Sequence, residues 1–575
     1  MTGIFPETDQ DKALAAWFWR NTHYFHGEEG AENLWGREFL EGGDSRTREY
    51  WTGLFAHGFG LCGTTHSQWT AELENLLGHG RARGVGVDGH NAFEVFLDGR
   101  WALLDHDLST VVFDTDGKRL LSIAEIRADL KKWIDRGYEP QKQHGWLVCG
   151  LHPNDGTVYS GYSTAEYFPG YAAVPPNVHL RRGETLRRYL EPGLEDGKTF
   201  VFWGRNYNTA GIPGPERSMT WVNQPEKMRG SREGAGYIPG QARYGNAEYT
   251  YKPDFKNGDY LEGVISETST NVTFEFYTPY IIGATPSNSK DWGVYDPGGR
   301  NGLVLRGKAD CPVEISVDQG GAWQNCGLFK DGMDLTDQAK GYRQYWLRFG
   351  AGAESLTDSG LTISTVCQAA VGILPRLKDH GSTVSFEASS AAVVSAGPTL
   401  PQARKHIVSG AFNTPKVTLE IAAPRQREAV AIYAAAHIAS GNPPSPDITF
   451  QIEFSEDHGN TWKPIVKDWK IPRRGNEPND FWSQSLCYGS TKLSGATSPI
   501  QIRFRNDGGR NYLRAEAHLV YKVPAGDQTA ITFTWNDSSG EHRDTHIASS
   551  NGPASWSIKT ADSVKTRWVE FAIAR

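Results

Sequence analysis

The pattern of hydrophobic and polar positions divides the chain into a helix-containing N-terminal part and a longer strand-rich remainder. Three segments carry the spacing of amphipathic helices: residues 13–25, 66–80 and 122–140. In the second segment, Trp69, Leu73 and Leu76 recur at the i, i+4, i+7 spacing of one helical face. The Gly-His-Gly that ends this segment is typical of a helix C-terminus. We therefore expect helices in the first 140 residues.

Between the second and third of these segments the pattern changes to alternation. Residues 92–99 (AFEVFLDG) and 100–107 (RWALLDHD) resemble two short strands that meet at Asp98-Gly99. An Asp-Gly pair between alternating segments is a strong hairpin signal, because the tight turn needs residues that tolerate positive φ. Residues 1–140 are therefore predicted to form an α+β unit in which a helix leads into antiparallel strands.

The next stretch, residues 141–245, is irregular and rich in Gly, Pro, Asn and Tyr. Long irregular stretches inside a compact protein are commonly functional loops. We expect this region either to complete a cleft over the N-terminal unit or to link the domains.

From residue 246 onward nearly every run resembles a strand. The strand-like runs are residues 271–282, 312–318, 344–350, 361–371, 417–424, 448–455, 500–506, 516–523, 531–536 and 567–574. Turns punctuate them at short intervals, which is typical of β-sandwiches and barrels.

This strand-rich part also repeats itself. Residues 313–323 and 450–462 each contain a strand, then S-x-D-x-G, then Trp three positions after that Gly. The second copy resembles a complete Asp-box, and the first has Ala322 where Thr is usual. We interpret the motif as a hairpin device in which the Asp caps turn amides and the Trp packs beneath. The repeat predicts two related sandwich domains, at 246–395 and 396–575.

The composition fits this multidomain α+β and all-β organisation and excludes several functions. A chain of 575 residues is too long for one ordinary domain. Its net charge of −8 gives no basic footprint for nucleic acid or an anionic membrane. No run approaches the roughly 18 apolar residues that a membrane helix needs. The aromatic content of 12% suits either sugar-binding grooves or aromatic-rich sandwich cores.

Compartment and oligomeric state stay open at this point. The first thirty residues lack the charged region and apolar core of a signal peptide. This leaves either the cytoplasm or export by a leader that the printed sequence does not include, for example into a periplasm. The six cysteines show no CxxC spacing, so we predict neither a disulfide framework nor a zinc ribbon.

One constellation of residues points to chemistry. Cys62 stands between glycines at the start of the second predicted helix, where unsatisfied amides favour a thiolate. The amide of Cys62 itself is one potential oxyanion donor. His90 begins the first hairpin strand and Asp105 ends the second. With the turn at Asp98-Gly99, residue 90 lies opposite residue 107 or 108, so Asp105 is about two positions away on the neighbouring strand. A Cys-His-Asp site is therefore predicted.

The order of these motifs resembles the transglutaminase-like superfamily of papain-type fold, as in bacterial transglutaminase-like proteins with trailing β-sandwich domains. The family's G-x-C helix start, its H-a-w-x-E-v-y-l strand and its G-x-W-x-x-x-D motif correspond to residues 60–62, 90–97 and 99–105. The resemblance covers roughly residues 50–110. It implies a Cys62 nucleophile, His90 as general base and acid, and Asp105 as the orienting group. It implies no cofactor, and no calcium ligands are recognisable between Cys62 and His90.

The resemblance also implies a second oxyanion donor from an upstream aromatic or Gln side chain. The candidates are Trp19, Trp35 and Trp51. Other polar residues crowd the same region: His57, His66, His106 and Asp107. We interpret these as surface or hydrogen-bonded structural residues. No HExxH or similar spacing supports a metal site, and none is predicted.

Three hypotheses of function follow. In the first, a cysteine amidase, peptidase or acyltransferase attacks an amide of a peptide-like substrate and forms a thioester. In the second, a polysaccharide lyase on the same scaffold uses His90, Tyr159 or Tyr162 to abstract the proton beside a uronate carboxylate that Arg205 neutralises. In the third, the chain is a non-catalytic binding protein. We favour the first.

Overall fold

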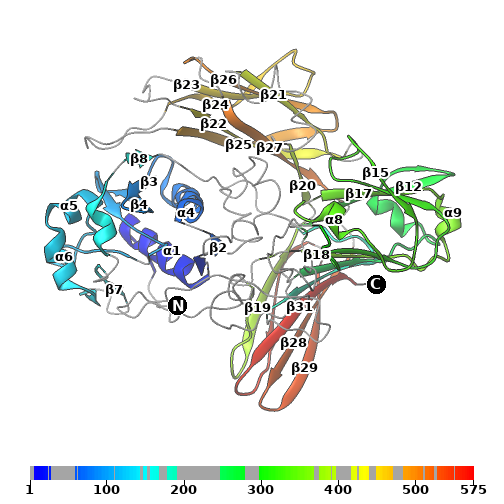
Figure 1. Ribbon diagram of the computed structural model, residues 1–575, viewed down its shortest axis with the longest axis horizontal. Helices are drawn as coiled ribbons and strands as arrows, with labels where there is room; N and C mark the ends of the chain where they lie inside the picture. The colour runs from blue at the N-terminus through cyan, green and yellow to red at the C-terminus, as the bar shows by residue number, and fades with distance from the viewer. Residues whose placement is uncertain are drawn as a thin grey trace.

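The protein is described here from a computed structural model, which is mainly antiparallel strands in several sheets with few helices (Figure 1). The structure describes residues 5–23, 25–26, 59–60, 62–108, 110–142, 147–151, 156–162, 164–166, 178–190, 247–278, 281, 297–342, 344–367, 369, 374–389, 391–396, 416–423, 427–439, 449–470, 484–508, 512–523, 527–549 and 551–574. No helix in these ranges combines the length and the apolar character needed to cross a membrane.

The N-terminal unit packs helices on a small antiparallel sheet. Its helices are α1 (Asp9–His23), α4 (Cys62–Leu77), α5 (Ile123–Ala128), α6 (Leu130–Arg136) and the 3-10 helix η4 (Gly156–Ser160). Its strands are β1 (Phe25–His26), β2 (Phe59–Gly60), β3 (Ala82–Val87), β4 (His90–Leu97), β5 (Arg100–Leu103), β6 (Glu139–Pro140), β7 (Val148–Cys149) and β8 (Thr164–Glu166). The main sheet has the order β5-β4-β3-β8, and buried Trp17 of α1, Trp69 of α4 and Phe93 of β4 share one core.

The predicted hairpin at Asp98-Gly99 is confirmed. Leu97 pairs with Arg100, and both turn residues have positive φ (48° and 80°), as this tight turn requires. The third predicted helix is divided at Asp129, whose extended φ of −148° ends α5 and precedes α6. Strand β3 was not predicted, because the glycines in ARGVGV hide its alternation.

The first sandwich consists of an eight-stranded and a five-stranded sheet. The larger sheet has the order β16 (Met333–Asp334), β13 (Leu303–Arg306), β18 (Thr362–Cys367), β10 (Ala247–Tyr251), β9 (Glu184–Tyr189), β31 (Lys565–Ile573), β28 (Thr529–Asp537), β29 (Gly540–Ala548). The smaller sheet has the order β11 (Val264–Thr268), β12 (Asn271–Tyr277), β17 (Gln344–Phe349), β14 (Pro312–Ser316), β15 (Gln324–Leu328). Short helices η5 (Asp259–Gly263), α8 (Thr336–Ala339) and α9 (Ala353–Leu356) connect the strands.

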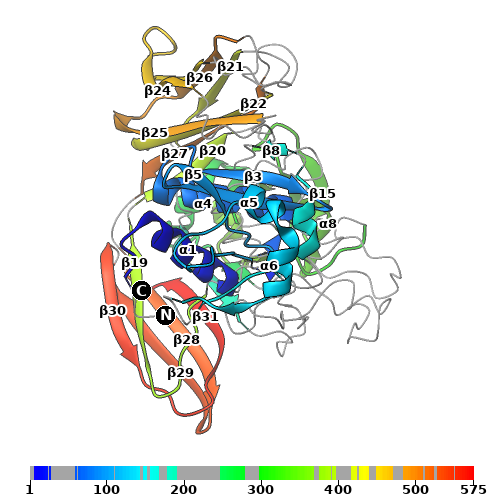
Figure 2. The same cartoon turned by 90° about the vertical axis from the view of Figure 1, so that its left-hand side faces the viewer.

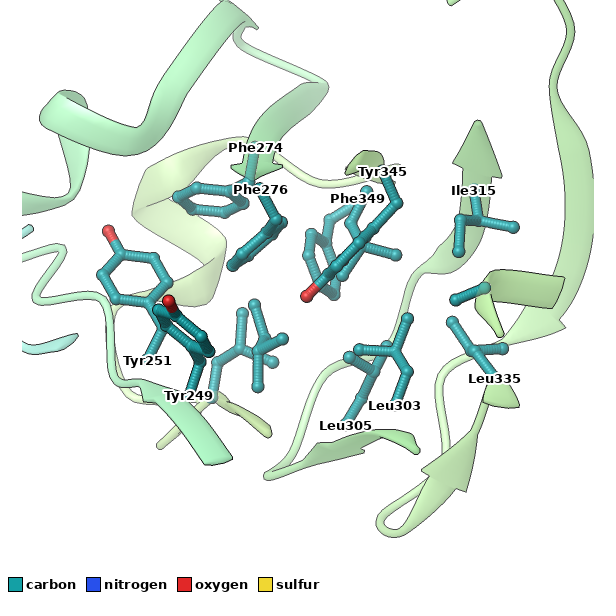
Figure 3. Close-up of a cluster of buried hydrophobic side chains, with 14 of the residues drawn as sticks. Tyr249, Tyr251, Phe274, Phe276, Leu303, Leu305, Ile315, Leu335, Tyr345 and Phe349 are labelled. Carbon is teal, nitrogen blue, oxygen red and sulfur yellow. The ribbon is translucent and has the colours of Figure 1, made fainter. Parts of the chain in front are cut away.

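The core of this sandwich is aromatic. Phe276 of β12 stacks on Tyr345 of β17 with ring centroids 4.6 Å apart, and Tyr251 of β10 meets Phe274 edge-on at 5.8 Å. Figure 3 shows these rings converging with the aliphatic side chains of the neighbouring strands. Part of the high aromatic content is therefore accounted for by core packing.

The second sandwich consists of two four-stranded sheets around one core. Their orders are β20 (Ala391–Ala396), β27 (Tyr512–Lys522), β22 (Ala429–Ala439), β25 (Gln484–Ala496), and β21 (Lys416–Ile421), β26 (Ile500–Asn506), β23 (Thr449–Ser455), β24 (Lys463–Lys470). The ten strand-like runs predicted from residue 246 onward all contain strands of one of the two sandwiches or their extension.

The predicted domain at 396–575 is wrong at its C-terminal end. Strand β31 pairs with β9 and β28, so the last strands extend the larger sheet of the first sandwich. The ribbon of β19 (Ser382–Ala388) and β30 (Gly552–Ile558) packs on this extension (Figure 2). In the chain, the second sandwich is inserted between these two strands. Alternation marks a segment as a strand but does not specify which sheet it joins.

The described part of the predicted loop region, residues 141–245, contains three strands, of which β7 pairs with β6 in a two-stranded sheet. Strand β8 pairs with β3 in the N-terminal sheet, and β9 pairs with β10 in the eight-stranded sheet. This region therefore links the N-terminal unit to the first sandwich.

The second sandwich also rests on the N-terminal unit, above it in both views (Figures 1 and 2). Trp101 of β5 is buried in the same cluster as the second sandwich's core, with Phe96 of β4 packed against it. The hydroxyl of Tyr488 donates to Glu74 Oε2 at 2.9 Å, which ties β25 to the last turns of α4. Helix α4 and strand β4 are thus both supported at the ends opposite to Cys62 and His90.

The two Asp-box hairpins fold alike. In the first, the Ala322 amide donates to Asp318 Oδ1 at 2.7 Å; in the second, the Thr461 amide donates to Asp457 Oδ1 at 2.8 Å. The following Trp of each box carries an arginine over its ring: Arg348 over Trp323 at 3.8 Å and Arg503 over Trp462 at 4.0 Å. The predicted hairpin role of the motif is confirmed.

Candidate active site

Asp105 is fixed at the centre of the candidate site by its own backbone. Its amide donates to the Thr110 carbonyl at 3.0 Å and its carbonyl accepts from Thr110 at 2.8 Å, which closes a short loop directly after β5. The Trp17 indole on α1 donates to the same Asp105 carbonyl at 2.9 Å. The side chain of Asp105 is completely buried, so its direction is set by rigid elements.

Both oxygens of the Asp105 carboxylate have hydrogen-bond partners. Oδ2 lies 2.8 Å from His90 Nε2 and 2.8 Å from the Tyr159 hydroxyl. Oδ1 accepts from the Leu108 amide at 2.9 Å and lies 3.3 Å from His66 Nε2. Burial alone would raise the pKa of Asp105, but the charge and hydrogen bonds of His90 and His66 hold it well below its ordinary value. Asp105 is therefore ionised at neutral pH.

His90 is held at Nε2 by Asp105, as the hairpin register predicted. Burial would lower the pKa of His90, yet the Asp105 carboxylate outweighs it and raises that pKa to about 10. The imidazole is thus protonated across the physiological range. Its other nitrogen, Nδ1, lies 3.9 Å from Asp107 Oδ2 and is the atom left to face the thiol of Cys62.

Cys62 is the first residue of α4, and no acidic residue in the first turn compensates the positive helix end. Burial alone would raise the pKa of this thiol, and the Asp107 charge acts in the same direction. The hydrogen bond with His90, its positive charge and the Asn91 backbone amide act the other way, and the pKa is lowered overall. The thiol is half-buried, so it stays open to a reactant.

The other five cysteines form a contrast. All six cysteines are described and none is in a disulfide. The pKa values of Cys149, Cys311 and Cys326 are raised, first of all by burial. That of Cys367 is raised to about 12, and that of Cys487 is raised further. Cys62 is therefore the one thiol in the chain whose surroundings favour the reactive form.

Of the predicted auxiliary residues, the structure brings some to the Cys-His-Asp site and places others elsewhere. Tyr159 of η4 joins the site through Asp105, but as a buried hydrogen-bond donor. Tyr162 instead lies beside the buried Arg83–Glu94 ion pair, with its hydroxyl 3.2 Å from Arg83 Nη2. On α1, the Trp17 indole donates to the Asp105 carbonyl. The role of Trp19 as a second oxyanion donor stays a prediction. The predictions for Trp35, Trp51, His57 and Arg205 fall outside the described residues.

Two residues with a larger part in the site than predicted are His66 and Asn91. His66 stands four residues after Cys62 on α4, so helical spacing places both on one face. Its ring packs edge-on to that of His90 at 5.7 Å and stacks on Phe93 at 6.1 Å. Asn91 follows His90, and its Nδ2 lies 3.7 Å from Cys62 Sγ.

His66, His90 and Asp105 also form a set that can hold a metal ion. One donor atom from each lies within 4.8 Å of the others, and two imidazoles with a carboxylate suit zinc. The same atoms already hydrogen-bond to one another and to Tyr159 and Leu108. We therefore assign them to the hydrogen-bonded arrangement that orients His90.

Comparisons with known proteins do not assign a family. No family model matches the chain, and no curated protein matches it. A distant structural similarity is found to latent PorU from Porphyromonas gingivalis, with a TM-score of 0.18 and 10% identity over 53% of this chain and 32% of that one. Others are the isomalto-dextranase of Arthrobacter globiformis T6 (TM-score 0.13, 13% identity, 49% and 35%) and PNGase F from Flavobacterium meningosepticum (TM-score 0.14, 9% identity, 54% and 99%).

The chain spans about a third of the length of PorU and of the isomalto-dextranase. These similarities carry no argument about chemistry. The function must be inferred from the site itself.

Proposed function

We propose that the chain is a transglutaminase-like cysteine hydrolase or acyltransferase that cleaves an amide bond through a thioester on Cys62. The observation that carries this proposal is the arrangement of Cys62, His90 and Asp105. A half-buried thiol with a lowered pKa adjoins an imidazole that a buried carboxylate holds at 2.8 Å in its protonated form. Such a pair supplies a thiolate and an acid together.

The first half of the reaction forms the thioester. Cys62 Sγ attacks the amide carbonyl carbon, an S–C bond forms and the carbonyl π electrons move to oxygen. The tetrahedral adduct collapses, the C–N bond breaks, and His90 Nδ1 gives its proton to the departing amine. Asp105 stays ionised and keeps the ring in position throughout.

The second half releases the acyl group. His90, now neutral, takes a proton from water or from a second amine as that molecule attacks the thioester. The C–S bond then breaks and the thiolate returns beside the imidazolium. Water gives hydrolysis and an amine gives transfer, and both use the same residues.

The test is to trap the acyl-enzyme. The full chain would be incubated with a panel of peptide amides and activated esters, with and without a primary amine, and the mass of each cysteine-containing peptide determined. We expect an acyl adduct on Cys62 that is absent from Cys62→Ala. Cys326→Ala is the matched control, because Cys326 is also half-buried but its pKa is raised. A complete panel without any adduct on Cys62 contradicts the proposal.

The alternative is a polysaccharide lyase on the same scaffold, with His90, Tyr159 or Tyr162 as its base. His90 is protonated across the physiological range and has no free lone pair for this task. Tyr159 is a poor base for a bound sugar, since its side chain is 1% exposed and its hydroxyl donates to Asp105. Uronic-acid polysaccharides belong in the same panel. A rise in ultraviolet absorbance from unsaturated products that survives in Cys62→Ala would favour this alternative.

A further inference from the structure

Asn91 offers two amide groups to the reacting sulfur. Its backbone amide is one of the groups that lower the pKa of Cys62. Its side-chain Nδ2 donates toward Cys62 Sγ across 3.7 Å. Asn91 lies on β4 next to His90, and its side chain is exposed to solvent.

The two amides suit different tasks. The backbone amide of Asn91 is fixed by the strand and acts on the thiolate whatever side chain stands there. The side-chain Nδ2 is too far from the sulfur for a strong hydrogen bond. It is better placed to bind an oxygen atom on a carbon that is itself bonded to the sulfur. When Cys62 Sγ bonds to a carbonyl carbon, the former carbonyl oxygen lies beside the sulfur, where an amide donor about 2.7–3.1 Å away stabilises its new charge.

A glycine keeps this space open. A Cβ at position 63 would lie 3.5 Å from Asn91 Nδ2, in ordinary contact with it. Gly63 therefore leaves room beside Nδ2 and next to the amide of Cys62. The first turn of α4 adds positive potential there and carries no acidic side chain of its own, while the Asp107 charge acts against it.

We propose that Asn91 is a catalytic residue whose Nδ2 donates a hydrogen bond to the oxyanion formed when Cys62 attacks a carbonyl, together with the Cys62 backbone amide. The proposal rests on the proposed thiol function and deepens it. The step needs no proton transfer: the S–C bond forms, the carbonyl π pair moves to oxygen, and both amides bind that oxygen. In this proposal Asn91 supplies the second oxyanion donor that the resemblance implied for an upstream aromatic or Gln side chain.

The test compares two reactions of Cys62. Alkylation by iodoacetamide requires the thiolate but forms no oxyanion. Acylation by p-nitrophenyl acetate requires the same thiolate and does form an oxyanion, and its leaving group needs no proton from His90. Both rates would be measured for wild type, Asn91→Ala and the isosteric Asn91→Asp. Asn75→Ala, an exposed asparagine near the other end of α4, is the matched control.

We expect Asn91→Ala to alkylate within about threefold of wild type, because the backbone amide remains, and to acylate about 100-fold more slowly. Asn91→Asp should acylate more slowly still, since a carboxylate repels the oxyanion. Acylation of Asn91→Ala at the wild-type rate overturns the inference, and so does an equal fall in both rates. Failure of the proposed function looks different: Cys62 of the wild-type protein would react with neither reagent faster than Cys326, and this would remove the basis of the inference as well.

Discussion

Asp105 in the N-terminal unit and Asp457 in the second Asp-box are both aspartates with several hydrogen-bond donors and a lowered pKa. The pKa of Asp457 is lowered to about 2, first by the Thr461 hydroxyl and then by backbone amides and Ser455. Asp105 is buried and its donors include two imidazoles, one of which adjoins a thiol.

The comparison shows that a strongly acidic carboxylate does not by itself indicate a catalytic role. The donors around Asp457 only close a turn, because neither a threonine hydroxyl nor an amide titrates near neutral pH. The donors around Asp105 include His90, which can give and take a proton beside Cys62. What the partners can do chemically separates the two regions.

The largest effect expected from this comparison is on reactivity. Asp105→Asn should lower the rate of Cys62 acylation by roughly 10³–10⁴, as for other orienting carboxylates, because the amide no longer holds the imidazolium. Asp457→Asn should leave that rate unchanged and lower only the unfolding midpoint slightly. Acylation kinetics with p-nitrophenyl acetate measure the first effect, and thermal unfolding measures the second. Equal rates for the two variants would remove the distinction between the regions.

The second prediction concerns the pH dependence of stability, which should depend on His90. The folded-state pKa of His90 is about 10, above its ordinary value of 6.5. The stability that protonated His90 contributes is therefore present in full below about pH 6.5 and is lost as the pH rises toward 10. We expect the difference in unfolding free energy between wild type and His90→Gln to shrink over this range. Denaturant titrations at several pH values test this, and a difference that grows toward pH 10 would contradict it.

Glu74 extends the comparison to a buried carboxylate without a catalytic partner. It accepts from the Gly80 amide, from Tyr488 and from His79 at 2.8–2.9 Å. Tyr488→Phe should cost about 1 kcal/mol of stability, since one hydrogen bond to a buried group is lost. The alkylation rate of Cys62 should stay within twofold of wild type. A large fall in that rate would mean that the second sandwich controls the site through α4.

The smallest effect concerns the incomplete Asp-box. Thr461 Oγ1 donates to Asp457 Oδ2, whereas the first box has Ala322 at the equivalent position. Ala322→Thr should supply the missing donor to Asp318 and raise stability by about 0.5–1 kcal/mol. Thr461→Ala is the reciprocal variant and should lower it. If the two changes do not have opposite signs, the boxes are not equivalent.

The site could be predicted from the sequence where local chemistry determines geometry. Asp98-Gly99 fixes the turn, the turn fixes the register, and the register brings His90 to Asp105. His66 could have been found from its spacing to Cys62 on one helix. Tyr159 is predicted only as a candidate base. Its hydrogen bond to Asp105 could not be predicted, because Tyr159 reaches Asp105 from a 3-10 helix 54 residues away whose sequence gives no signal of that contact.

The sheets were less predictable than the strands. Alternation correctly identified β31, but its pairing with β9 joins segments far apart in the chain. Such a pairing depends on which apolar faces meet in three dimensions, and the pattern of one strand does not contain that information.

The most direct test of the central claim is the rate of iodoacetamide alkylation of each cysteine as a function of pH, measured by peptide mapping. We expect Cys62 to react rapidly at mildly acidic pH, where Cys326 is inert, and to lose this advantage in His90→Ala. That result would establish a thiolate held by His90. If Cys62 reacts no faster than Cys326 at any pH, the chain has no activated nucleophile and the proposed function is wrong.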